Sequence, residues 1–283
     1  MIKMSQGLWK EWAAGGLANA VTSAMLNPLD VAKTQMQTLR TGLSLRTTLH
    51  SLYRQGGVAG VFAPGLLASA IREMIYSGAK AGLYVPLRNY FLEAFGGESP
   101  AAVKVLAALA TGTLGSLAAN PIDVVKIRLM RDPSAYPSTL GALPLIFRAE
   151  GLKGLYRGLL PSTLRGACVS AGELATYDIV KGALKTHAFA NVDGVGLHVA
   201  SSLVTGCVAA VVAAPWDLIK ARAMSSTQGE SIFTVLVQLK REGGLPLSLF
   251  RGLVPAYLRL GPHALIAFPI FEQLRLALGL EYL

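Results

Sequence analysis

Long apolar stretches alternate with polar segments along the chain, and the alternation occurs three times. Each third holds an apolar stretch, a polar loop with an amphipathic segment, and a second long apolar stretch. A helix of about 20 residues crosses the hydrocarbon core of a membrane, and backbone groups in lipid must be satisfied within the helix. The pattern predicts an all-α membrane protein with six transmembrane helices. The apolar stretches cover residues 12–26, 66–92, 103–119, 159–184, 199–214 and 253–280.

Three marks recur at a fixed spacing. Pro-x-Asp-x-x-Lys motifs begin at Pro28, Pro121 and Pro215, which lie 93 and 94 residues apart. A glycine follows each proline by 37 residues, and an arginine follows each glycine by seven. Because self-similarity at one period indicates structural repeats, we expect three tandem, pseudo-symmetric repeats over residues 1–99, 100–192 and 193–283, in one transmembrane domain. The glycines are Gly65, Gly158 and Gly252, and the arginines are Arg72, Arg165 and Arg259.

Composition supports the membrane assignment. Only 15% of the 283 residues are charged, and the mean hydropathy is +0.47, whereas soluble domains carry about 25% charged residues. The net charge is +10, but no dense Lys/Arg run or aromatic platform indicates nucleic acid. Two cysteines and four scattered histidines lack metal-ligand spacing, and no nucleophile motif is visible. We therefore expect no metal, no cofactor and no enzymatic activity.

The charged residues of the three motifs predict a ring of ion pairs. A charged side chain at the centre of a bilayer costs about 2.5–3.5 kcal/mol unless it is paired or hydrated. Around a three-fold axis, the aspartate of one repeat can meet the lysine of the next. The alternative is that each pair caps its own helix at the membrane surface. The residues are Asp30, Lys33, Asp123, Lys126, Asp217 and Lys220.

A second charged set lies in the second apolar stretch of each repeat. Its members align at the repeat spacing, although Val85 replaces the acid in the first repeat. Two partial rings near opposite ends of a bundle suggest two gates that open in turn, and a solvated charged face is the alternative. The set comprises Arg88, Asp178, Lys181, Glu272 and Arg275.

The three recurring arginines lie between these two sets and predict a binding site. Helical spacing places Tyr76 and His263 one turn beyond two of them, and Lys80 and Glu173 two turns beyond. Glu73 and Glu173 are the only acids that the sequence places nearby, so we expect an anionic ligand, since arginine binds carboxylates bidentately. The alternatives are that these two glutamates neutralise the arginines, and that His263 only packs.

These motifs resemble those of the mitochondrial carrier family over essentially the whole chain. The resemblance implies a six-helix barrel of the inner mitochondrial membrane, with a short matrix helix in each repeat, termini toward the intermembrane space, and alternating access. It implies that the motif ring is the matrix gate, braced by Gln37, with Met130 and Met224 at the equivalent positions, and that the second set is the cytoplasmic gate.

The resemblance is strongest to the branch of oxoglutarate and dicarboxylate carriers and uncoupling proteins. It places the substrate contacts at Arg72-Glu73, Arg165-Gly166 and Arg259-Leu260, with Glu73 standing where dicarboxylate members usually have glutamine. It also implies cardiolipin sites at Tyr156-Arg157-Gly158 and Phe250-Arg251-Gly252.

The sequence thus predicts a carrier, working as a monomer, that exchanges small dicarboxylates or oxo-dicarboxylates such as malate and 2-oxoglutarate. The alternatives are an uncoupling-type proton or anion leak, an amino-acid carrier in which Glu73 binds the ammonium group, and a membrane scaffold that does not transport.

Overall fold

The computed structural model describes residues 2–39, 44–95, 100–169, 176, 195–227, 232–243 and 247–279. These residues form helices and turns, with no strand among them, which confirms the all-α prediction. The first repeat contains α1 (Ile2–Met25), α2 (Asn27–Thr38), α3 (Leu45–Phe62) and α4 (Leu66–Ala94). The second contains α5 (Pro100–Arg131), α6 (Thr139–Leu155) and helical residues 159–169; the third contains α8 (Val195–Ser225), α9 (Ile232–Gly243), the 3-10 helix η1 (Leu247–Phe250) and α10 (Leu253–Ala277).

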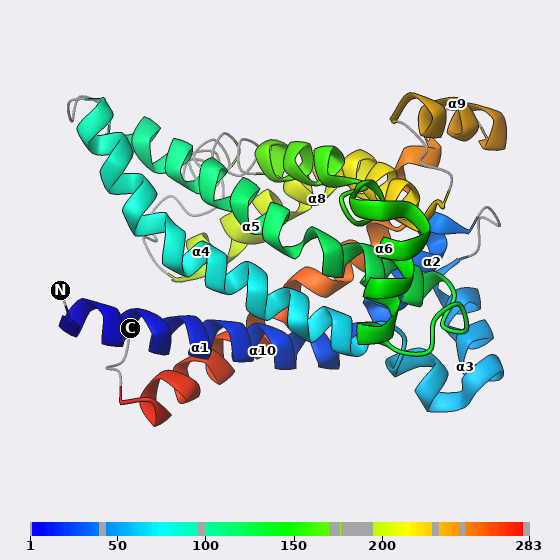
Figure 1. Ribbon diagram of the computed structural model, residues 1–283, viewed down its shortest axis with the longest axis horizontal. Helices are drawn as coiled ribbons and strands as arrows, with labels where there is room; N and C mark the ends of the chain where they lie inside the picture. Colours follow the sequence, from blue (N-terminus) through cyan, green and yellow to red (C-terminus); the bar gives the residue numbers. More distant parts are fainter. Residues whose placement is uncertain are drawn as a thin grey trace.

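The long helices form a bundle in which the first and last repeats meet. Helix α4 packs against α1 and α5, α8 packs against α5 and α10, and α10 packs against α1. The shorter helices α3, α6 and α9 gather with α2 at one end, opposite the start of α1 and the end of α10 (Figure 1). We term this the α2 end.

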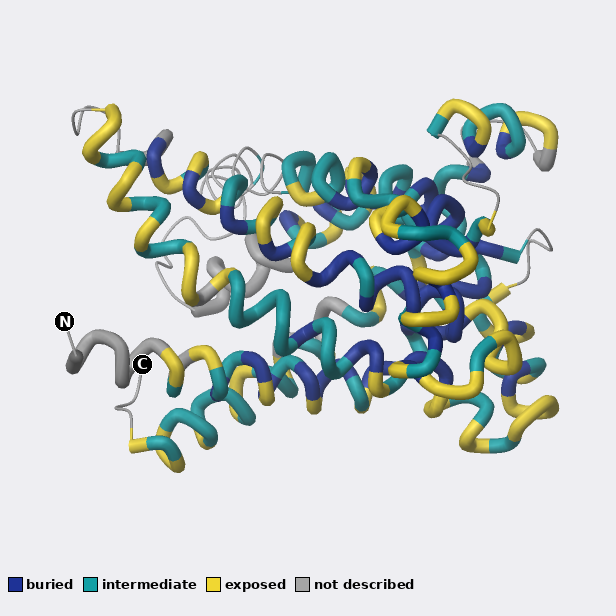
Figure 2. The backbone as a smooth tube through the Cα atoms, viewed as in Figure 1, coloured by how far each residue is buried: buried dark blue, intermediate teal, exposed yellow. Residues whose placement is uncertain are grey.

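Polar residues are buried and apolar residues are exposed to an extent typical of membrane bundles. Thr22, Asn27 and Asp123 are buried, whereas Leu265 and Phe268 are 76% and 67% exposed. Figure 2 shows buried segments concentrated toward the α2 end and exposed positions along the outer faces of the long helices. By length and composition, three stretches of the described residues are able to span a membrane: Leu45–Ala94, Val103–Arg131 and Val204–Ser225.

The recurring glycines have a structural explanation. Gly65, Gly158 and Gly252 all have positive φ, at 65°, 70° and 84°, and two of them cap the starts of α4 and α10. A Cβ at any of the three would lie within 3.0 Å of a side chain that crosses from another repeat. Only glycine suits both the left-handed backbone and this close approach. The crossing side chains are Met130 over Gly65, Met224 over Gly158 and Gln37 over Gly252.

Two buried asparagines fix the α2 end. Asn27 donates to the carbonyls of Phe62 and Pro64, at 2.6 and 3.0 Å. Asn120 makes the equivalent bonds to the carbonyls of Leu155 and Arg157, at 2.8 and 3.2 Å. These bonds engage the last carbonyls of α3 and α6, which lack partners within their helices, and one carbonyl just beyond each helix. The asparagines therefore tie the short helices to the long ones in the first two repeats.

Helices α1 and α4 pack closely enough that one glycine is required. A Cβ at Gly78 would lie 1.5 Å from Nε1 of Trp12, which donates to the Met74 carbonyl at 3.2 Å. We predict that Gly78→Ala lowers the free energy of unfolding in detergent by about 1–3 kcal/mol, because the indole must leave this position. Thermal unfolding of the purified protein measures the change.

Gly82→Ala is the matched control, because no described atom lies within 4 Å of a Cβ at this position in the same helix. Alanine there should stabilise the helix by up to about 1 kcal/mol. Equal effects of the two substitutions would contradict the proposed packing.

Candidate functional site

The motif residues of the three repeats form a closed ring of ion pairs near the α2 end. Each aspartate carboxylate meets the lysine Nζ of the next repeat, as the repeat spacing predicts, and does not merely cap its own helix. The pairs are Asp30 with Lys126 at 3.0 Å, Asp123 with Lys220 at 2.8 Å, and Asp217 with Lys33 at 2.7 Å. The ring therefore joins every repeat to both others.

Each aspartate also binds one of the three recurring arginines. The expectation that only Glu73 and Glu173 could neutralise these arginines is wrong. The second helix of each repeat places its guanidinium group within ion-pair distance of a ring aspartate. Each aspartate thus receives its arginine from the preceding repeat. The pairs are Arg72 with Asp123 at 3.2 Å, Arg259 with Asp30 at 3.0 Å, and Arg165 with Asp217.

Glu73 breaks the three-fold symmetry of this arrangement. Its carboxylate lies 2.7 Å from Nη1 of Arg72, and the residue is only 7% exposed. The Arg72 guanidinium also lies over the ring of Tyr76, 4.7 Å from its centroid. Gly166 and Leu260 occupy the equivalent positions, so Arg72 is held more firmly than Arg165 or Arg259.

The ring and the arginines carry an excess of positive charge. Six cationic side chains, three lysines and three arginines, share four carboxylates among the described residues. The paired set therefore retains two positive charges. In a low-dielectric interior such an excess attracts a counter-anion.

Three cavities surround these side chains, and Arg72 and Arg165 line all of them. The first, about 300 Å³, contains the ion-pair ring and Gln37. The second, about 450 Å³, adds His263 beside Glu73 and Arg259. The third, about 350 Å³, adds Lys80 and Gly166. The structure thus brings the described members of the expected binding site together; Glu173 and the Leu260 side chain lie outside the description.

The expected cytoplasmic gate at the opposite end of the bundle stays a prediction. Asp178 and Lys181 lie outside the described residues. Of the described members, Arg88 donates to Oδ1 of Asn89 at 3.4 Å, and the Arg275 guanidinium lies 5.7 Å from the Phe271 ring centroid.

A second set of bonds between repeats was not expected from the sequence. The side chain two positions before each brace position donates to the backbone carbonyl of the brace residue in the next repeat. Gln35 bonds to Met130 at 3.4 Å, Arg128 to Met224 at 3.1 Å, and Arg222 to Gln37 at 3.1 Å. The equal spacing of these residues, 93 and 94, is the signal that could have revealed them.

One of the expected cardiolipin motifs is engaged within the protein. Arg157 contacts Glu150 at 2.6 Å and the Ser226 carbonyl at 2.6 Å, and Glu150 also forms two bonds with buried Arg128, at 2.6 and 2.9 Å. Gly158 and Gly252 adopt positive φ beside Tyr156 and Phe250-Arg251. Cardiolipin binding at both motifs remains a prediction.

Helices long and apolar enough to span a membrane, packed around a charged cavity, are typical of a membrane transport protein. The family model for "Mitochondrial carrier protein" matches residues 5–95, 97–188 and 192–281. The chain therefore belongs to the mitochondrial carrier family and is a multi-pass transport protein of the inner mitochondrial membrane.

Several named relatives align along nearly the whole chain. Mitochondrial uncoupling protein 1 of Arabidopsis thaliana is 33% identical, covering 96% of this chain and 94% of the relative. Mitochondrial citrate transporter F of Aspergillus niger is 32% identical, covering 92% and 86%. The mitochondrial dicarboxylate carrier of Caenorhabditis elegans is 31% identical, covering 95% and 94%.

A double-mutant cycle tests the ring. Lys33→Gln and Asp217→Asn should each destabilise the protein, because each leaves a charged partner uncompensated. The double variant should lose less free energy of unfolding than the two single variants lose together. We expect a coupling of about 0.5–3 kcal/mol in the free energy of unfolding. Thermal unfolding in detergent provides the measurement.

The matched control pairs Lys33→Gln with Asp123→Asn, since Asp123 binds Lys220 and Arg72 and not Lys33. Because both residues belong to the same ion-pair ring, some coupling is expected, but it should be smaller than that between the directly paired Lys33 and Asp217. Equal coupling in both cycles would contradict the pairing between specific repeats.

Proposed function

We propose that this carrier exchanges small dicarboxylates or oxo-dicarboxylates, of the malate and 2-oxoglutarate type, by alternating access. The observation that supports this proposal is the excess of two positive charges in the ion-paired set, to which Lys80 adds a third at the edge of one central cavity. A dianion would offset most of that excess, and guanidinium groups bind carboxylates with two parallel hydrogen bonds. The names of two relatives, a dicarboxylate carrier and a citrate transporter, are consistent with it.

The same aspartates connect binding to gating in this proposal. A dicarboxylate that binds Arg165 and Arg259 competes with Asp217 and Asp30 for these guanidinium groups. Once the arginines turn to the substrate, each of those aspartates keeps only a lysine. The ring is then easier to open, and the ions of the matrix gate can separate. A substrate moves the equilibrium only because it binds the intermediate state more tightly than the starting state.

The second candidate is an amino-acid carrier, and Glu73 is the observation that favours it. Its buried carboxylate lies within the cavity that also contains Arg165, Arg259 and His263. An amino acid with an ammonium group and carboxylates could place its cation on Glu73. The two candidates differ in what Glu73 does, so one substitution separates them.

Exchange in liposomes tests the proposed site. Labelled malate and 2-oxoglutarate should enter liposomes with the purified protein when these are preloaded with dicarboxylate, and not when they are empty. Arg165→Gln and Arg259→Gln should each slow the exchange about 10- to 100-fold, because each removes a charged hydrogen bond worth about 1.5–3 kcal/mol. Arg148→Gln, at an exposed position in α6, is the control and should exchange normally.

Each other outcome selects a different function. Exchange of amino acids alone would favour the second candidate, and proton conductance without a counter-substrate would indicate a leak. No transport of any kind by a protein with an unchanged unfolding transition would favour a scaffold. Normal malate exchange in both arginine variants would refute the site.

Glu73→Gln distinguishes the two candidates. In a dicarboxylate carrier it removes a negative charge beside Arg72, so the KM for malate should fall several-fold. In an amino-acid carrier it should abolish transport. Glu93→Gln, an exposed change of the same charge near the end of α4, is the control. Loss of malate exchange in Glu73→Gln alone would contradict the dicarboxylate proposal.

A further inference from the structure

The ends of α2, α5 and α8 are joined unequally, although the repeats place equivalent residues there. Three positions in each repeat recur at spacings of 93 and 94 residues near these ends. The second repeat has arginine at all three positions, the third repeat at two and the first repeat at none. The residues are Gln35, Thr38 and Pro64 in the first repeat, Arg128, Arg131 and Arg157 in the second, and Arg222, Ser225 and Arg251 in the third.

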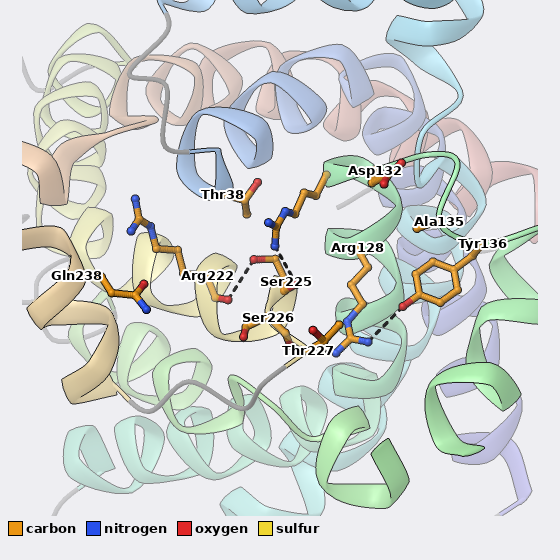
Figure 3. Close-up of a pocket in the computed structure, with 11 residues that line it drawn as sticks. Thr38, Arg128, Asp132, Ala135, Tyr136, Arg222, Ser225, Ser226, Thr227 and Gln238 are labelled. Atoms are coloured by element: carbon orange, nitrogen blue, oxygen red, sulfur yellow. Dashed lines mark hydrogen bonds between the residues drawn. The ribbon is translucent and has the colours of Figure 1, made fainter. Parts of the chain in front are cut away.

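The second repeat holds the end of α8 with four charged hydrogen bonds. In Figure 3, Arg128 of α5 lies beside Ser225 and Ser226 at this end. The last carbonyls of a helix lack partners within it and carry partial negative charge, so cationic donors stabilise them. The bonds to backbone carbonyls run from Arg128 to Met224 at 3.1 Å and to Ser226 at 3.2 Å, from Arg131 to Ser225 at 3.0 Å, and from Arg157 to Ser226 at 2.6 Å.

One carboxylate orients two of these three arginines. Glu150 of α6 accepts two hydrogen bonds from Arg128, at 2.6 and 2.9 Å, and lies 2.6 Å from Nη1 of Arg157. The Arg128 side chain is only 4% exposed. Because the guanidinium groups are fixed on this side, they present their remaining N–H groups to α8. The second and third repeats are therefore clamped together at the α2 end.

The joint between α2 and α5 has a weaker bond at the equivalent place. Gln35 donates from a neutral amide to the Met130 carbonyl at 3.4 Å. A hydrogen bond between neutral groups is about half as strong as one from a guanidinium group. Among the residues that the structure describes, the charged contact of this joint is the ring pair of Asp30 and Lys126. The closure of α2 against α5 therefore depends mainly on that pair.

We propose that the α2 end opens first between α2 and α5, while the second and third repeats stay together. The joint between α8 and α2 is intermediate, because Arg222 donates to the Gln37 carbonyl at 3.1 Å. When the ion-pair ring separates, α5 and α8 keep their four charged bonds, and α2 can swing away about its joint with α8. This device does not depend on which substrate the carrier moves.

Equivalent substitutions at two joints test the proposal. Lys126→Gln removes the ring pair between α2 and α5, and Lys220→Gln removes the one between α5 and α8. Pulsed electron paramagnetic resonance of the purified protein then measures the distances between spin labels at residues 39 and 132 and at residues 132 and 227. The labelling substitutions are Leu39→Cys, Asp132→Cys and Thr227→Cys, in a chain in which Cys168→Ser and Cys207→Ser remove the native thiols.

Lys126→Gln should add a longer population to the distance between residues 39 and 132. In Lys220→Gln, any longer population between residues 132 and 227 should be at least about tenfold smaller, because four charged hydrogen bonds remain there. Arg54→Gln, an exposed change of the same charge in α3, is the control and should leave both distances unchanged.

Gln35→Arg gives the weak joint the donor that the other repeats have. It should reverse the effect of Lys126→Gln, and in the otherwise unchanged protein it should raise the unfolding temperature by about 2 °C or more. Equal lengthening at both joints, lengthening only between residues 132 and 227, or no lengthening at either joint would overturn the proposal. So would a Gln35→Arg variant that neither restores the short distance nor raises the unfolding temperature.

Discussion

The aspartate that binds two cations from two other repeats is the interaction on which the bundle depends. Each of Asp30, Asp123 and Asp217 holds a lysine on one side and an arginine on the other. A charge in a membrane interior is tolerated only when it is paired, and removal of one partner leaves the other uncompensated. The same three carboxylates therefore close the α2 end and hold the arginines that face the cavity.

This sharing depends on a fold in which polar groups lie inside. The glycines at positive φ let Met130, Met224 and Gln37 cross between repeats, and Asn27 and Asn120 satisfy the ends of the short helices. Apolar side chains such as Leu265 are left on the outer surface, where lipid replaces water as the solvent. Packing and hydrogen bonds, not burial of an apolar core, must then hold the long helices together.

Symmetry determined how much could be predicted from the sequence. Residues at equal spacing in three repeats, such as Asp30, Asp123 and Asp217, lie at the same level around the pseudo-three-fold axis, so the ion-pair ring could be predicted from their sequence positions. The ion pair between Arg72 and Asp123 could not be predicted in this way, because it depends on how far the second helix of a repeat tilts toward the ring. The bond between Arg128 and Glu150 was missed for a related reason: it joins two elements whose approach no spacing encodes.

Some positions carry different residues in the three repeats, and these positions make the three arginines unequal. Arg165 has a side chain 41% exposed, against 23% for Arg72, which Glu73 also holds. A ligand with two carboxylates needs two guanidinium groups. Arg165 and Arg259 each pair with one carboxylate, whereas Arg72 pairs with two, so less free energy is needed to free Arg165 and Arg259 for the ligand. On the proposed function, we infer that Arg165 and Arg259 are the main anchors, while Glu73 keeps Arg72 on the ring. Arg131, opposite Thr38 and Ser225, similarly gives the α2 end a charge that the other repeats lack.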